Sequence, residues 1–197
     1  MTYELLTALA AFALVSSITP GPNNLMLMAS GANFGFRRTV PHILGVALGF
    51  VFMLSLVGVG LVRVFDAYPV SYTVLKGANV LYLMHLAFKI ATSAPMLTTN
   101  HGGRPLTFLQ AALFQWVNPK GWAMALTAVT VYAPSQSPAV IAIVALVFGA
   151  INLPSVSSWT LMGQRIQGVL SSPRRLRAFN FTMAALLIGS LYPVLMD

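Results

Sequence analysis

Six stretches dominated by apolar side chains alternate with shorter polar segments along the 197-residue chain. They cover residues 5–29, 40–61, 70–91, 108–131, 138–162 and 178–195. A helix of about 20 apolar residues crosses the hydrocarbon core of a bilayer, so each stretch predicts a transmembrane helix. The third stretch is the most polar, because it includes Lys76, Asn79, His85 and Lys89. The pattern predicts an all-α membrane protein with six transmembrane helices.

The first and fourth predicted helices are interrupted near their middle. The first contains the sequence TPGPNN at residues 19–24, and the fourth contains QWVNPK at residues 115–120. A proline inside a helix removes an N–H donor and clashes with the preceding turn, at a cost of roughly 3 kcal/mol. In lipid the freed carbonyls have no water, so a break is tolerated where it is buried in protein or lines a cavity. We expect helices 1 and 4 to be broken mid-membrane.

The two interruptions resemble each other and suggest an internal repeat. Ile18-Thr19-Pro20 aligns with Val117-Asn118-Pro119, which lies 99 positions later. Three helices per half would place the two halves in opposite orientations, as in many secondary transporters. We therefore predict a single membrane domain, residues 1–197, built from two inverted three-helix repeats at about 1–98 and 99–197.

Composition agrees with a membrane protein and removes several kinds of chemistry. Hydrophobic residues make up 57% of the chain and charged residues 7%, whereas soluble domains are about 25% charged. There is no cysteine, and the three histidines are scattered, so we expect no metal site. No phosphate-binding loop and no nucleophile–base or paired-carboxylate motif occurs. We expect neither an enzyme nor a cofactor.

The net charge of +8 is distributed unevenly over the predicted loops. One side of the six-helix arrangement receives eight of the eleven basic residues: Arg37, Arg38, Lys89, Arg104, Arg165, Arg174, Arg175 and Arg177. The other side receives all three carboxylates, Glu4, Asp66 and Asp197. Basic loops are typically cytoplasmic, so we predict that both termini face outward. The surplus of positive charge is explained by lipid headgroups and loop orientation, without nucleic acid.

The interruptions favour a binding site over a simple proline kink. A half-helix that begins near Pro22 presents N–H groups and a partial positive charge, which suit a carboxylate. The half-helix that ends near Thr19 presents carbonyls, which suit an ammonium group. Lys120 is an ionisable residue deep in a span, where function is the first hypothesis and snorkelling to the interface is the alternative. The predicted ligand is a zwitterion such as an amino acid.

These segments also resemble a known family. TPGPNNL at residues 19–25 and QWVNPKGW at residues 115–122 are similar to the two signature segments of the LysE-type amino-acid exporters, nearest to the homoserine/threonine (RhtB) branch. FGAINLPSVSSW at residues 148–159 and SPRRLRAFN at residues 172–180 resemble later segments of the same family. The resemblance implies a bacterial inner-membrane exporter of amino acids or related metabolites, driven by an ion gradient.

The resemblance also implies which residues bind the substrate. They are Thr19, Pro20, Gly21, Pro22, Asn23 and Asn24, facing Gln115, Asn118, Pro119 and Lys120, with Asn152, Ser155 and Ser158 added from the fifth helix. The chain departs from the family pattern at Asn79, where a small glycine is expected, and at His85, where an aromatic residue is expected. Lys120 and His85 are the candidates to carry protons, although a neutral His85 bonded to a neighbouring helix is the simpler alternative.

The leading hypothesis is a secondary exporter of amino acids that works by alternating access. The alternatives are a transporter of another small solute on the same scaffold, or a non-transporting membrane subunit or membrane enzyme. The GxxxG sequence Gly45-Val46-Ala47-Leu48-Gly49 favours close helix packing. We expect this contact within one copy, and a homodimer is the other arrangement it allows.

Overall fold

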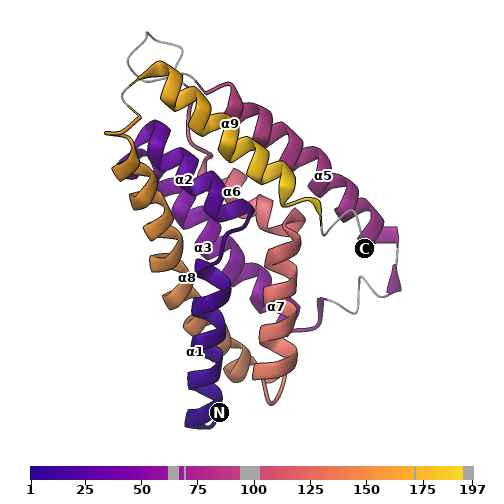
Figure 1. Cartoon of the computed structure of the whole chain (residues 1–197). Coiled ribbons are helices and arrows are strands. Elements are labelled where there is room, and N and C mark those ends of the chain that lie inside the picture. The colour runs from indigo at the N-terminus through magenta and orange to yellow at the C-terminus, as the bar shows by residue number, and fades with distance from the viewer. Residues whose placement is uncertain (62–66, 69, 94–102, 171, 193–197) are drawn as a thin grey trace.

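The structure is a computed structural model that describes residues 1–61, 67–68, 70–93, 103–170 and 172–192. Within these ranges every regular element is helical. The elements are α1 (Tyr3–Ile18), α2 (Pro22–Phe34), α3 (Phe36–Gly58), α5 (Val70–Ala91), α6 (Phe108–Phe114), the 3₁₀ turn η1 (Gln115–Val117), α7 (Pro119–Tyr132), α8 (Pro138–Ile166) and α9 (Pro173–Gly189). In Figure 1, α8 runs beside α1 and α2, and α5 lies along α9.

The helices follow the predicted stretches with shifts at several ends. The helix α5 has the predicted bounds. The helix α2 continues past residue 29 to Phe34 and ends at Gly35, whose φ of +77° favours glycine and turns the chain directly into α3. The helix α9 begins at Pro173 and not at residue 178, because proline suits the first helical position and its arginines extend the helix beyond the apolar stretch.

The helix lengths agree with a multi-pass membrane protein. In the described residues, Phe36–Gly58, Thr73–Ala91 and Pro138–Ile166 are each long and apolar enough to cross a bilayer. The helices α1 and α2 together make a fourth candidate, bent by 54° at the first predicted break. The second predicted break is also present, because α6 passes through η1 and Asn118 before α7 begins. The complete six-helix topology stays a prediction.

Small residues let several helices approach at backbone distance. A Cβ added to Gly45 would lie 2.3 Å from the Phe108 carbonyl oxygen, and one added to Gly49 would lie 2.6 Å from the Ala112 Cα. The predicted GxxxG contact therefore joins α3 to α6 within one copy of the chain. A Cβ on Gly31 of α2 would lie 2.1 Å from the Thr160 carbonyl oxygen of α8. These positions hold glycine because the facing helices leave no room for a side chain.

The interior has two large apolar clusters with polar residues between them, and a small third cluster of Leu25, Ala29 and Met183. Along α8, the first cluster ends at Phe148 and the second includes Val156, with buried Asn152 between. Each broken helix also passes from one cluster to the other at its break. The first cluster contains Ala13 of α1 and Met124 of α7, and the second contains Met26 of α2 and Phe114 of α6. The polar residues of both breaks lie at this change. The fold thus buries a polar layer between two apolar layers.

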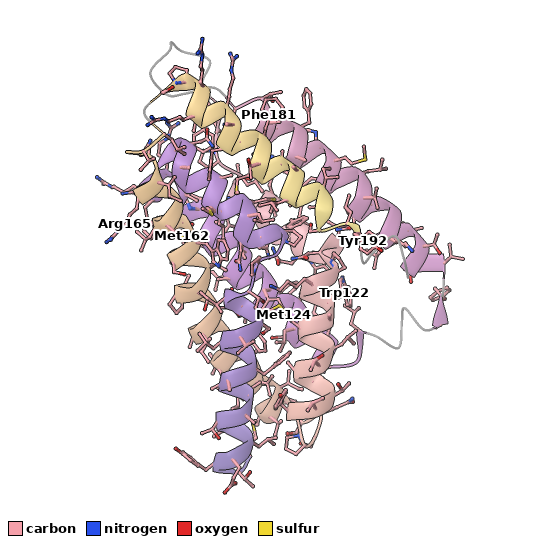
Figure 2. All side chains as sticks on the ribbon, viewed as in Figure 1. Trp122, Met124, Met162, Arg165, Phe181 and Tyr192 are labelled. Atoms are coloured by element: carbon pink, nitrogen blue, oxygen red, sulfur yellow. The ribbon has the colours of Figure 1, made fainter. Side chains whose placement is uncertain are left out.

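The outer surface is mainly apolar, as a bilayer requires. Phe181 of α9 is 60% exposed and Phe52 of α3 is 58% exposed, and Figure 2 shows Phe181 on the outer side of α9. Large exposed apolar side chains are rare over so much of a soluble surface.

One end of the bundle gathers the predicted basic loops. Asn33 of α2 and Asn180 of α9 exchange amide hydrogen bonds of 2.8 and 3.1 Å, and Asn180 Nδ2 also donates to the Ser93 carbonyl after α5. The Phe36 N–H donates to the side chain of Gln164 near the end of α8. These contacts bring together the segments that carry seven of the eight basic residues named above, and Arg104 lines a cavity with Lys89 at the same end. We call this the basic end. Which side of the membrane it faces stays a prediction.

Candidate functional site

The first break is a short extended segment whose carbonyls accept hydrogen bonds from side chains of three helices. Between α1 and α2, Thr19 and Gly21 are extended. Asn24 Nδ2 donates to the carbonyls of Ser17 and Thr19, both at 2.8 Å. Trp159 Nε1 of α8 donates to the Ile18 carbonyl at 3.1 Å. The carbonyls freed at the end of α1 are therefore satisfied by protein donors, as a helix break inside a membrane requires.

Lys120 of α7 supplies the remaining donors at the first break. Its ammonium donates to the Thr19 carbonyl at 2.8 Å, the Thr19 hydroxyl at 2.9 Å and the Pro20 carbonyl at 3.3 Å. A cation at the carboxyl end of a helix is stabilised by the helix dipole. The carbonyls that the sequence assigned to a ligand ammonium are thus occupied by Lys120 in this conformation.

The second break is satisfied in a similar way. Trp122 Nε1 donates to the Trp116 carbonyl at 2.9 Å, and Asn79 of α5 donates to the Val117 carbonyl. The sequence did not predict these roles for Asn79, Trp122 or Trp159. The sequence marked Asn79 as unusual, because the resemblance predicts a small residue at this position. It could not identify the partner of Asn79, because Val117 lies 38 positions away.

The two breaks face each other. Asn23 Nδ2 donates to Gln115 Oε1 at 2.8 Å, and Gln115 Nε2 donates back to Asn23 Oδ1 at 3.2 Å. Asn23 directly follows Pro22, the first residue of α2, as Lys120 directly follows Pro119, the first residue of α7. The equivalent helix starts are therefore Pro22 and Pro119. These helix starts are two residues away from the alignment of Pro20 with Pro119 that the sequence suggested, and the repeat itself stays a prediction.

A cavity of about 20 Å³ lies at this junction. It is lined by Ser16, Ser17, Asn23, Asn24, Phe50, Asn118, Lys120, Gly121, Met124, Asn152 and Val156. In the described part of the chain, the side-chain oxygens of Asn118 and Asn152 are buried without a hydrogen-bond partner. The first turns of α2 and α7 have no side-chain cap. The cavity therefore combines unused acceptors, two positive helix ends and one ammonium group.

Five of the predicted substrate-binding residues line this cavity: Asn23, Asn24, Asn118, Lys120 and Asn152. The others do not: Thr19, Pro20, Gly21, Pro22, Gln115, Pro119, Ser155 and Ser158. Ser155 and Ser158 lie further along α8, and their hydroxyls donate to the Ile151 and Ser155 carbonyls at 2.7 Å. His85 is exposed on α5, with its ring centroid 6.3 Å from that of Tyr82. Substrate binding by the two serines and proton transfer by His85 remain predictions. Ser16, Ser17 and Phe50 line the cavity and were not predicted, because only the packing of α1 and α3 brings them there.

Comparison with known proteins decides the family. Residues 14–190 match the family model described as LysE type translocator. The chain belongs to the LysE-type translocator family. Curated relatives named cysteine/O-acetylserine efflux protein are 31% identical in Escherichia coli O139:H28 and 30% identical in Escherichia coli K12, each over 95% of this chain and 96% of the relative. No solved structure matches the chain.

Family membership confirms the resemblance drawn from the two signature segments. This member of the family is a multi-pass membrane transporter of small molecules and not an enzyme. The assignment to the homoserine/threonine branch stays a prediction, since the relatives above carry a different substrate in their name.

Proposed function

We propose that this translocator exports small neutral amino acids across the bacterial inner membrane, by alternating access at the junction of the two breaks. The observation that carries the proposal is the meeting of both breaks around Lys120 and the unpartnered oxygens of Asn118 and Asn152. Cysteine and O-acetylserine, which name the relatives, are the first substrates to test.

The charges of the cavity suit the two poles of an amino acid. The substrate carboxylate pairs with Lys120 and the uncapped N-terminus of α2 or α7, where an anion is stabilised by peptide N–H groups. The substrate ammonium is accepted by the side-chain oxygens of Asn118 and Asn152, which are 2% and 5% exposed. Buried acceptors without donors are costly, so a bound ammonium recovers that energy.

The volume of the cavity defines the conformational change that transport requires. About 20 Å³ holds one water molecule and no amino acid. The hydrogen bonds that close the junction are those of Lys120 to Thr19 and Pro20, and those between Asn23 and Gln115. We infer that the substrate carboxylate draws Lys120 from these oxygens and opens the junction to one side at a time.

The packing of the helices supports an inverted repeat as the basis of this movement. In an inverted repeat, α1 would correspond to α6, α2 to α7 and α3 to α8. The helices α1 and α2 both pack on α8, and α6 and α7 both pack on α3. The helix α3 contacts α8, and α5 contacts α9. These helix pairs correspond to one another, as a twofold relation between the halves would produce. This supports six membrane-spanning helices in two halves.

Coupling to an ion gradient is part of the proposal. Of the described residues that line the cavity, Lys120 is the one with an ionisable side chain. An ionisable group in a membrane interior commonly belongs to an ion or proton pathway. We therefore assign proton exchange to Lys120 first.

The test is efflux from proteoliposomes loaded with O-acetylserine or cysteine, with Lys120→Met and Asn152→Leu as variants. We expect each variant to reduce the initial rate by at least roughly tenfold, the effect of one lost charge-assisted hydrogen bond. The matched controls are Lys76→Met on α5 and Ser157→Ala on α8, whose side chains do not line the cavity at the junction. Wild-type rates in both site variants would overturn the proposed site.

A further inference from the structure

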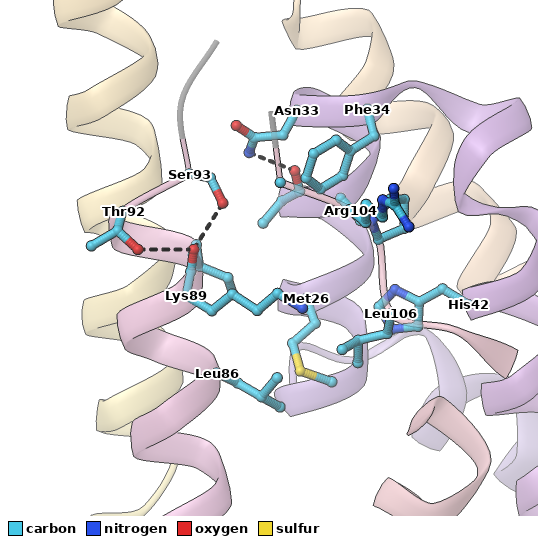
Figure 3. A pocket seen from close by; sticks show the side chains of 15 residues that line it. Met26, Asn33, Phe34, His42, Leu86, Lys89, Thr92, Ser93, Arg104 and Leu106 are labelled. Atoms are coloured by element: carbon cyan, nitrogen blue, oxygen red, sulfur yellow. Dashed lines mark hydrogen bonds between the residues drawn. The ribbon is translucent and has the colours of Figure 1, made fainter. Parts of the chain in front are cut away.

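A second and larger cavity lies at the basic end of the molecule. It has a volume of about 220 Å³ and is lined by α2, the start of α3, the last turns of α5 and residues 103–106. It shares no lining residue with the break cavity. We call it the basic pocket. Figure 3 shows Lys89 reaching into the pocket from α5, with Arg104 and His42 on the facing wall.

The pocket has positive charge that no carboxylate side chain of the described residues balances. Lys89 and Arg104 line it, and within the part of the chain that the structure describes the carboxylate side chain is that of Glu4, at the start of α1. Glu4 does not line the pocket. Two cations on one partly enclosed surface attract an anion, so the pocket suits an anionic ligand.

His42 adds a buried polar group that the described protein leaves unused. Its side chain is 1% exposed, and in the described residues neither Nδ1 nor Nε2 has a hydrogen-bond partner. A neutral imidazole offers one donor and one acceptor. Burying both without partners is unfavourable, so the arrangement is explained by a ligand with polar groups beside its anionic group.

The remaining lining fits a small molecule. Met26, Leu86 and Leu106 give the pocket an apolar part, and Ser30 and Asn33 add polar groups on α2. The helix α2 connects this pocket to the break cavity, because Pro22 begins the helix at the break and Asn33 lines the basic pocket. Along the helix axis, Met26 of the pocket is roughly 3 Å beyond Asn24 of the break cavity, and Asn33 is roughly 14 Å beyond it, at 1.5 Å per residue. A solute held here lies beside the half-helix that begins at the transport junction.

We propose that the basic pocket is a capture site that binds the carboxylate of the exported solute between Lys89 and Arg104, with His42 bonding its polar remainder. The identity of the solute, a small neutral amino acid, rests on the proposed function. Its consequence is that the transporter binds its substrate twice, first at the basic end and then at the breaks.

The test measures binding apart from transport. Thermal stabilisation of the purified full-length protein in detergent is titrated with O-acetylserine and with propionate, a carboxylate without an amine. We expect both to stabilise the wild type, and Lys89→Met and Arg104→Met each to weaken their apparent affinity by roughly tenfold. Arg174→Met is the matched control, since Arg174 is exposed at the same end and does not line the pocket.

A further variant separates binding from folding. His42→Phe keeps an aromatic ring and removes both unpartnered nitrogens, so we expect equal or higher thermal stability with weaker binding of O-acetylserine. Binding of propionate should change less, because it has no polar remainder for His42. Unchanged O-acetylserine binding in this variant would overturn the role of His42.

Three outcomes would overturn the capture site. The first is no stabilisation of the wild type by either carboxylate. The second is the same loss in Arg174→Met as in the pocket variants. The third is stabilisation by short-chain phosphatidylglycerol through Lys89 and Arg104 without any by propionate, which would make the pocket a lipid headgroup site. If the wild type binds carboxylates through Lys89 and Arg104 but shows no efflux, the pocket is supported. That result contradicts only the proposed function.

Discussion

At the scale of single residues, Asn79 shows how one helix stabilises a break in another. Its side chain is 2% exposed, and its amide donates to the Val117 carbonyl, which η1 leaves without a helical partner. The resemblance to the family predicts a small residue at this position. The hydrogen bond gives the amide a structural role in this chain.

We predict that Asn79→Leu destabilises the fold by about 1–3 kcal/mol, because it leaves the Val117 carbonyl buried without a donor. The measurement is the free energy of unfolding in mixed micelles. Thr182→Val is the control: that exposed hydroxyl donates to the Ala178 carbonyl of its own helix, and we expect a change within about 0.5 kcal/mol. Equal effects of the two substitutions would contradict the assigned hydrogen bond.

Gly21 provides a residue-scale prediction for transport. A Cβ at this position would lie 2.7 Å from Lys120 Cδ, and the extended backbone accepts any residue. We expect Gly21→Ala to push the flexible Lys120 side chain from the Thr19 oxygens, to leave the fold intact and to lower efflux by roughly tenfold. Initial efflux rates check this, and a wild-type rate with an unchanged melting temperature would show that the Lys120 contacts are dispensable.

At the scale of elements, the contact of α2 with α8 holds the second half of the first broken helix in place. A Cβ on Gly31 would lie 2.1 Å from the Thr160 carbonyl oxygen, and one on Gly163 would lie 2.0 Å from the Met28 carbonyl oxygen. Both obstacles are backbone atoms, so relief requires the helices to separate. The position of α2, and hence of both cavities along it, depends on these two glycines.

We therefore predict that Gly31→Ala and Gly163→Ala destabilise the protein by about 1–3 kcal/mol or more through overpacking. Gly77→Ala in α5 is the matched control, since a Cβ there meets nothing within 4 Å. Alanine is the better helix former by about 1 kcal/mol, so we expect the control to be neutral or stabilising. Thermal unfolding in detergent measures all three, and a tolerated Gly31→Ala would show that α2 and α8 separate easily.

At the scale of the whole molecule, the basic end defines an orientation that can be measured directly. The chain has no cysteine, so single cysteines report their own exposure to a membrane-impermeant maleimide. We predict that Ser135→Cys, in the turn between α7 and α8, is labelled in intact cells. Arg174→Cys, at the start of α9, should be labelled only after permeabilisation. The reverse pattern would place the basic end outside.

The sequence indicates both breaks and most helix bounds, because these depend on local chemistry. Proline lacks an N–H wherever it occurs, and apolar length decides whether a helix suits a bilayer. Two prolines stand at the first break, and the helix begins at Pro22, as the sequence predicts. Where local rules compete, the prediction shifts. The arginines after Pro173 are helical although they are not apolar.

By itself, the sequence determined a broken-helix membrane protein, the family and the residue types near the breaks. Only the tertiary structure decided that Lys120 takes the carbonyls predicted for a ligand, that Asn23 pairs with Gln115, and that Lys89, Arg104 and His42 share a pocket. The physical reason is distance along the chain. These partners are brought together by the packing of helix faces, and that packing depends on small residues such as Gly31 and Gly45, whose facing helices no local pattern specifies.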